Sequence, residues 1–126
     1  MNMLIPIAKL YVFDTTGLLC VIEFRNDGFE VQVEWPEDVS LRGAKFVATA
    51  YKYRAETGRD ILRASKNMIA YIGDNYILAS SFRKISEDEV VRVLKKVYEI
   101  LSAVKSFDPN EIGEVVAKAI LTEFAG

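Results

Sequence analysis

The side chains of this chain that could transfer protons are mainly carboxylates, because the sequence contains no histidine. Without histidine, neither a Ser–His–acid triad nor a Cys–His nucleophile can be built within one chain. The acid–base candidates are Asp14, at the end of an apolar run, and Asp74, in the turn Gly73-Asp74-Asn75. Aspartate is also an ordinary turn residue, and turn formation is the better interpretation at both positions.

The other candidates for chemistry are isolated in the sequence. Ser80 and Ser81 have no base to activate them, so we expect polar strand residues. Cys20 is the single cysteine and lies among leucine, valine and isoleucine, which predicts a buried thiol rather than a disulfide or a metal ligand. Gly43 and Gly58 are too isolated for a phosphate-binding loop. We therefore expect no enzyme activity, no cofactor and no metal.

Charge is nearly balanced overall, at −2, but it is unevenly distributed along the 126 residues. Residues 14–38 hold seven acids and only one base, Arg25. The acids are Asp14, Glu23, Asp27, Glu30, Glu34, Glu37 and Asp38. Residues 42–66 hold seven bases against two acids, Glu56 and Asp60. This asymmetry could guide a partner or a second subunit, or the two segments could neutralise each other on one surface.

A basic patch is the alternative source of function. Its members are Arg42, Lys45, Lys52, Arg54, Arg59 and Arg63. With Tyr51 and Tyr53 among them, they could contact the phosphates and bases of a nucleic acid, or an acidic membrane surface. Helical spacing distributes them around a helix and no RNA-recognition motif is present, so nucleic acid is the less favoured partner.

Two strands that are apolar on both faces open the chain, at residues 8–14 and 18–25, with a turn between them that predicts a hairpin. Such strands need cover on both sides of a sheet. After a second turn ending in Gly28, residues 29–35 alternate between apolar and polar side chains. This pattern predicts an edge strand with one solvated face, on which Glu30 and Glu34 discourage edge-to-edge pairing.

Pro36 ends this strand, and Asp38 or Ser40 can cap a helix that runs to about Thr57. Gly58 is placed to end the helix in a left-handed conformation. One face of this helix carries Leu41, Ala44, Ala48, Tyr51 and Ala55.

Three further strands, at 61–64, 68–72 and 76–82, precede two helices. Ser86 and Glu89 form the sequence of a capping box, and Asp108-Pro109 starts the final helix. The predicted inward stripe of the first of these helices is Val90, Val93, Leu94, Val97, Leu101 and Val104. The buried side of the last is predicted as Ile112, Val115, Val116, Ala119 and Phe124.

These elements predict one α+β domain over residues 1–126. We expect an antiparallel sheet of five to six strands, with one helix on one face and two C-terminal helices on the other. The apolar N-terminal segment 1–7 has no basic flank and Lys9 follows it, so we expect no secretory signal. No apolar run approaches the length of a membrane span, and a cytoplasmic location is the expectation.

Two segments carry a resemblance to a known family. The run KLYVFDTTGLL (9–19) resembles the first hairpin of longin domains, and MIAYIGDNYILASS (68–81) resembles the central hairpin of clathrin-adaptor small chains and medium-chain N-terminal domains. The element order is also that of a longin or profilin-like fold, with residues 29–35 as an added or extended edge strand. The resemblance implies a module without catalytic residues that binds small GTPases, trafficking partners or a second longin-like subunit.

We therefore predict a non-catalytic protein-interaction module that docks such a partner or another copy of itself. The interface candidates are Phe29, Val31, Val33 and Trp35 on the edge strand, and Phe46 and Tyr53 on the first helix. Phe107 is a further aromatic candidate, because aromatic residues at element edges often anchor interfaces. The alternatives are the basic-patch binder and a small-molecule sensor with a pocket between sheet and helix.

Overall fold

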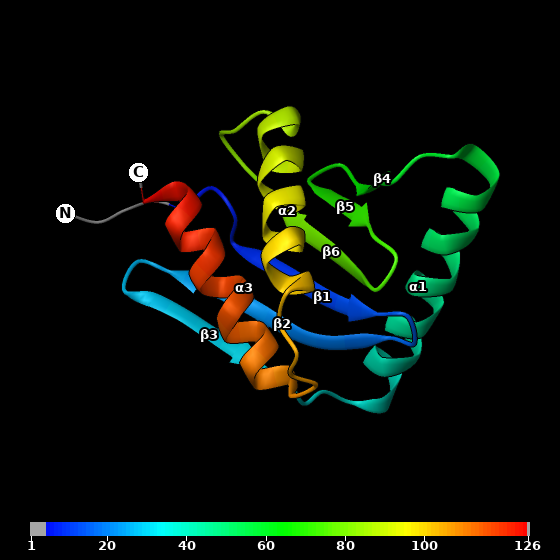
Figure 1. The fold of residues 1–126 in the computed structure, drawn as a ribbon, viewed down its shortest axis with the longest axis horizontal. Coiled ribbons are helices and arrows are strands. Elements are labelled where there is room, and N and C mark those ends of the chain that lie inside the picture. Colours follow the sequence, from blue (N-terminus) through cyan, green and yellow to red (C-terminus); the bar gives the residue numbers. More distant parts are fainter. Residues whose placement is uncertain (1–4, 126) are drawn as a thin grey trace.

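A computed structural model describes residues 5–125, so the first four residues of the apolar segment 1–7 lie outside it. Six strands and three helices follow one another in the predicted order (Figure 1). They are β1 (Lys9–Asp14), β2 (Leu18–Arg25), β3 (Gly28–Gln32), α1 (Glu37–Thr57), β4 (Ile61–Ser65), β5 (Met68–Ile72), β6 (Tyr76–Ser81), α2 (Glu87–Ser102) and α3 (Pro109–Phe124).

All six strands form one sheet in the order β3-β2-β1-β6-β5-β4, and every neighbouring pair is antiparallel. Helix α1 lies on one face, and α2 and α3 cover the other (Figure 1). The predicted fold class is therefore confirmed, with β3 at one edge of the sheet. The strand ends at Gln32, short of the predicted end at residue 35.

Two apolar clusters fill the space between the layers, one on each face of the sheet. The α2/α3 side buries Leu10, Val12 and Ile22 from the strands, and the α1 side buries Phe13 and Ile77. The predicted stripe of α2 is confirmed from Val90 to Leu101, whereas Val104 lies beyond the helix and is half-buried. On α3, Val115 and Phe124 are also only half-buried. Alternating side chains of β1 thus enter opposite cores.

Helix α1 differs from the prediction in its cap and in its buried face. Neither Asp38 nor Ser40 caps it; the helix starts after Pro36 without a side-chain cap, and the Ser40 hydroxyl accepts a hydrogen bond from Trp35 Nε1 at 2.8 Å. Its C-terminus is as predicted, because Gly58 is left-handed (φ 71°) and donates its backbone N–H to Arg54 O.

The sequence placed Leu41, Ala44, Ala48, Tyr51 and Ala55 on one face of this helix, but the residues that α1 buries are Gly43, Val47 and Ala50. Of the five, only Tyr51 is half-buried, and Leu41 is 58% exposed. Glycine at 43 allows the close approach, because a Cβ there would lie 3.0 Å from the Cβ of Leu18.

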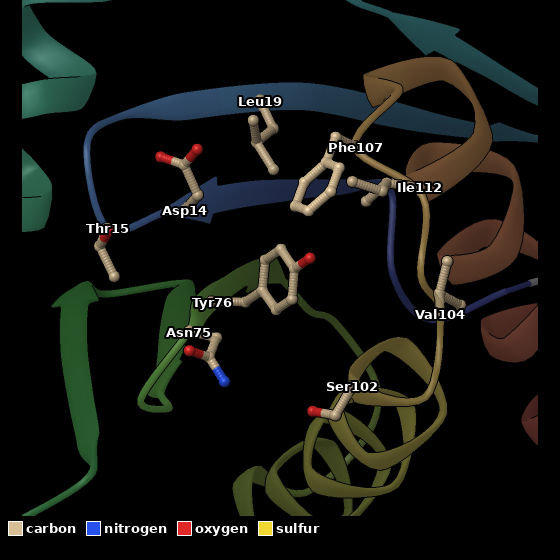
Figure 2. Close-up of a pocket in the computed structure, with 9 residues that line it drawn as sticks. All are labelled: Asp14, Thr15, Leu19, Asn75, Tyr76, Ser102, Val104, Phe107 and Ile112. Carbon is tan, nitrogen blue, oxygen red and sulfur yellow. The ribbon is translucent and has the colours of Figure 1, made fainter.

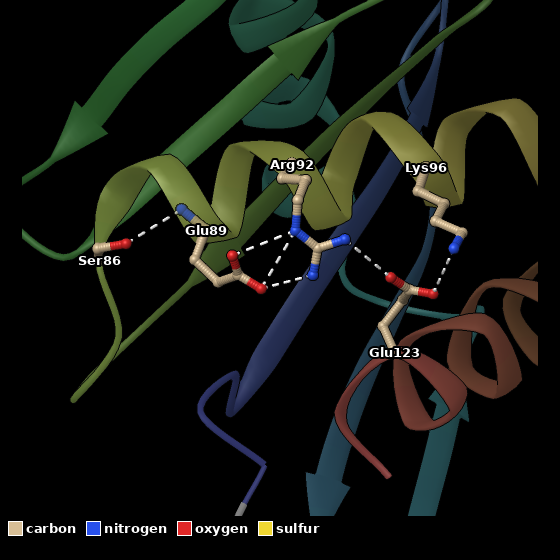
Figure 3. Close-up of polar contacts among 5 residues, drawn as sticks. All are labelled: Ser86, Glu89, Arg92, Lys96 and Glu123. Carbon is tan, nitrogen blue, oxygen red and sulfur yellow. Dashed lines mark hydrogen bonds and ion pairs between the residues drawn. The ribbon is translucent and has the colours of Figure 1, made fainter. Parts of the chain in front are cut away.

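Helices α2 and α3 begin at the predicted residues and are joined by charged side chains (Figure 3). Ser86 accepts the Glu89 backbone N–H at 3.2 Å, but the Glu89 carboxylate binds Arg92, so only half of the predicted capping box forms. Arg92 also reaches Glu123 on α3, at 3.2 Å, and Lys96 pairs with the same carboxylate. Hydrogen bonding from Arg92 lowers the pKa of Glu89. This network fastens the two helices to each other on their outer side.

Within residues 5–125, no helix combines the length and the apolar character needed to cross a membrane.

Two adjacent serines on β6 differ in hydrogen bonding and provide a matched test of the core. The Ser80 side chain is fully buried and its hydroxyl has no partner among the described residues, whereas Ser81 Oγ accepts the Lys9 backbone N–H at 3.0 Å. We expect Ser80→Ala to raise the free energy of unfolding by about 1 kcal/mol, and Ser81→Ala to lower it by about the same amount. Urea denaturation of both variants measures this, and a destabilised Ser80→Ala would contradict the unpaired hydroxyl.

Candidate functional site

Strand β3 lies at one edge of the sheet, and its outer edge carries main-chain groups that no strand within residues 5–125 uses. The backbone N–H of Phe24 donates to Ala8 O at 3.0 Å, so the main-chain groups of Phe24 point toward β1. The main-chain groups of its neighbours on β2, Glu23 and Arg25, therefore point toward β3. Because residues of a strand point their main-chain groups alternately to its two edges, the β3 residues opposite them, Glu30 and Gly28, bond to β2. The N–H and C=O groups of the intervening residues therefore point outward. These residues are Phe29 and Val31, with Val33 continuing the alternation beyond the strand.

The opposite edge of the sheet, on β4, is partly closed. Ile72 N donates to Asp60 O at 2.7 Å, so the main-chain groups of the next residue, Ile61, point outward. The Ile61 carbonyl accepts a hydrogen bond from the Tyr53 hydroxyl of α1 at 2.9 Å. A bulge separates Arg63 from Ser65. The Arg63 guanidinium folds back onto the Lys66 carbonyl and the Glu87 carboxylate. Bulges and charged side chains of this kind protect a sheet edge from further pairing.

The two faces of β3 differ in chemistry. Phe29, Val31 and Val33 pack half-buried against the core on the α3 side, where a Cβ at Gly113 would lie 2.4 Å from Val31 Cγ1. Glu30, Gln32 and Glu34 are exposed on the other side, as the alternation predicted. A shallow groove of about 490 Å³ runs along this strand. Its lining residues are Glu23, Arg25, Glu30, Val31, Gln32, Val33 and Glu34.

The other interface candidates are held within the domain. Trp35 is half-buried and donates a hydrogen bond to Ser40. The centroids of the Phe46 and Phe13 rings are 5.0 Å apart, and the Tyr53 hydroxyl donates to the Ile61 carbonyl. By contrast, Phe107 is 93% exposed in the segment between α2 and α3. The structure also exposes Leu41 on α1 and Ile100 on α2, neither of which the sequence predicted as an interface residue.

Comparison with known proteins adds no assignment. A scan against protein-family models finds no match for this chain, and a search of curated proteins finds no significant relative. The resemblance to longin domains therefore stays a prediction.

A second hollow, of about 400 Å³, lies where the β1–β2 and β5–β6 turns meet the α2–α3 segment (Figure 2). The side chains of Leu19, Tyr76, Phe107 and Ile112 extend toward it in Figure 2. Its other lining residues are Asp14, Thr15, Asn75, Ser102 and Val104. The hollow thus combines two aromatic rings with several hydrogen-bonding groups.

The two acid–base candidates, Asp14 and Asp74, lie at hairpin turns. Asp14 Oδ1 accepts hydrogen bonds from Thr16 N at 2.8 Å, Thr16 Oγ1 at 2.7 Å and Gly17 N at 3.0 Å. Asp74 is exposed and pairs with Arg54 at 3.1 Å. Asp14 therefore has the structural role that aspartate commonly has in a turn. Asp74 lies in the β5–β6 turn, and its carboxylate binds Arg54 of α1.

The basic patch is largely occupied by ion pairs inside the domain. Arg42 pairs with Asp38, Lys52 with Glu56, Arg54 with Asp74 and Arg63 with Glu87. Among the described residues, Lys45 and Arg59 are the members without an ion pair.

The acidic and basic segments of the sequence barely neutralise each other. Within the described chain, the ion pair between Arg42 and Asp38 is the single one that joins residues 14–38 to residues 42–66. The strand of the acidic segment, β3, and the strand of the basic segment, β4, lie at opposite edges of the sheet. The charge asymmetry of the sequence is therefore also an asymmetry in space.

Cys20 is fully buried, as predicted, and burial raises the pKa of its thiol to about 12. The thiolate is the reactive form, so we expect almost no alkylation of the native protein at pH 8. Iodoacetamide labelling followed by mass spectrometry tests this, with the denatured protein as the control that should label fully. Rapid labelling of the folded chain would show that Cys20 is accessible.

Proposed function

We propose that this domain is a non-catalytic protein-interaction module whose binding site is the free outer edge of β3. The observation that carries the proposal is the set of outward main-chain groups at Phe29, Val31 and Val33. An extended segment of a partner can add to such an edge as a further strand, with main-chain hydrogen bonds supplying affinity.

The surroundings of β3 support strand addition. The half-buried row Phe29, Val31 and Val33 would extend the apolar layer under α3 to an incoming strand. The exposed row on the other face offers carboxylates and an amide for specificity. The edge of β4 offers these features to a smaller degree, because Tyr53 binds the outward carbonyl of Ile61 and the bulge after Arg63 interrupts the strand.

The kinds of partner that we propose are another copy of this chain, a small GTPase or a trafficking-type protein. The last two rest on the resemblance to longin domains. A nucleic acid or an acidic membrane is the weaker alternative, because most of the basic patch is paired within the domain.

Proline substitution separates the two sheet edges. Val31→Pro removes an outward N–H of β3 and leaves the ladder to β2 intact, and Arg63→Pro does the same at the outer side of β4. We expect a protein captured by the wild-type domain from its source cell to be lost with Val31→Pro and retained with Arg63→Pro. Quantitative affinity capture measures this.

Circular dichroism and thermal melting check that both proline variants fold. Val33→Pro, at the end of the strand, is the substitute for Val31→Pro if packing against α3 is lost. Equal capture by all variants, or repeated empty captures with the wild type, would contradict the proposed site.

A small-molecule sensor is the second candidate function, because the 400 Å³ hollow beside Tyr76 and Phe107 falls within the usual range of ligand pockets. Its rings and polar groups would suit a compact aromatic compound with a hydrogen-bonding substituent.

Thermal stabilisation across a panel of such compounds tests the sensor. We expect a ligand that raises the melting temperature of the wild type to lose this effect in Tyr76→Ala and Phe107→Ala, and to keep it in the control Leu41→Ala on α1. A panel without any stabilising compound would contradict the sensor and leave the β3 proposal unaffected.

A further inference from the structure

We propose that the strand that adds to β3 is β3 of a second copy of this chain, in a register centred on Val31. This inference rests on the proposed function and specifies its partner. The reason is a match of charge and shape that the strand has with itself in this register.

Symmetry restricts how two copies of β3 can pair. A two-fold axis perpendicular to the sheet makes the two strands antiparallel and keeps equivalent faces on the same side. The apolar rows of both copies then lie together on the α2/α3 side. An in-plane axis along the strands would instead make the strands parallel and set the apolar row of one copy beside the polar row of the other. The perpendicular axis is therefore the arrangement that continues both layers.

The outward main-chain groups restrict the register. Because they belong to Phe29, Val31 and Val33, alternate residues must face each other across the axis, and registers differ by steps of two residues. Centring the pair on Glu30 sets that carboxylate against its own copy. Centring the pair on Gln32 sets Glu30 against Glu34 twice. Like charges directly opposite each other destabilise a strand pair.

Centring the pair on Val31 avoids both clashes. It also requires Val33 and Glu34, which follow β3, to continue in the direction of the strand. Phe29 then faces Val33 of the second copy in the apolar row, and Val31 faces itself. In the polar row Glu30 faces Gln32, an amide that can donate to a carboxylate. The Phe29–Val33 and Glu30–Gln32 contacts occur twice because the axis repeats them, and the Val31 contact lies on the axis and occurs once.

The same register brings Glu34 a charged neighbour. Among the described residues Glu34 has no ion pair. It would face Gly28 of the second copy, and Gly28 pairs on β2 with Arg25. Within one copy Arg25 pairs with Glu30 at 2.6 Å and with Glu23 at 3.6 Å. Glycine has no side chain to separate Arg25 from Glu34, so the exposed guanidinium can bridge to this further carboxylate. The acids of β3 then select a register instead of preventing all pairing.

Charge substitutions at Glu30 and Gln32 test the register, with the dimer dissociation constant from sedimentation equilibrium as the readout. We expect the wild type to form a dimer. Gln32→Glu should weaken it about tenfold, because two like-charge contacts appear. Adding Glu30→Lys to Gln32→Glu should restore the wild-type constant or tighten it, because two opposite-charge contacts replace them.

The double variant identifies the register uniquely. In a pair centred on Glu30 it would set lysine against lysine, and in a pair centred on Gln32 it would set glutamate against glutamate. Ala64→Glu, which adds the same charge at an exposed position of β4, is the matched control and should leave the constant unchanged. Circular dichroism verifies folding, and the substituted side chains are exposed.

Three results would overturn the inference: a wild type that stays monomeric at about 100 µM, a dimer unaffected by Gln32→Glu, and a double variant that remains weak. A monomeric wild type would exclude the second copy but not the β3 edge, since capture that depends on Val31 would still support that edge. Capture of a partner independently of Val31, by contrast, would remove the proposed function itself.

Discussion

The buried middle of the sheet depends on helices covering both of its faces. Leu10 and Val12 are fully buried on one side of β1, and Phe13 is almost fully buried on the other. A strand of this composition would expose an apolar row to water if either layer were missing, at a cost of roughly 1.5–3 kcal/mol for each large side chain. The three helices are therefore needed above and below the central strands. Helix α1 packs on β1, β2 and β5, and the acidic face of β3 remains in solvent.

Strand and helix positions follow from local signals, so the sequence predicts them well. The run 18–25 is strand β2 as expected, and Gly58, Ser86 and Asp108 mark helix ends where the sequence places them. These signals are local because a turn, a cap or a two-sided apolar strand is determined by neighbouring residues. The existence of three strands after α1 was predictable for the same reason.

Which face of α1 turns inward could not be predicted, because small residues occur on more than one side of the helix. The close approach of Gly43 to Leu18 favours one orientation, and that contact joins residues 25 positions apart. It also explains why Phe46 and Tyr53 line the core margin. The partial closure of the β4 edge was equally hidden, since the contact between Tyr53 and Ile61 is tertiary. Phe107 was recognisable as an aromatic residue, but its exposure depends on the path of the α2–α3 segment.

The cap on β4 has a consequence for how far assembly can proceed. A sheet that is open at both margins can recruit copies without limit, which is the geometry of a fibril. Here the Tyr53 hydroxyl, the bulge at Arg63 and the returning guanidinium occupy one margin. Two molecules joined at β3 would present only the partly closed edges of β4 outward. Assembly would then stop at the dimer. Raising the protein concentration would increase the fraction of dimer rather than produce longer assemblies.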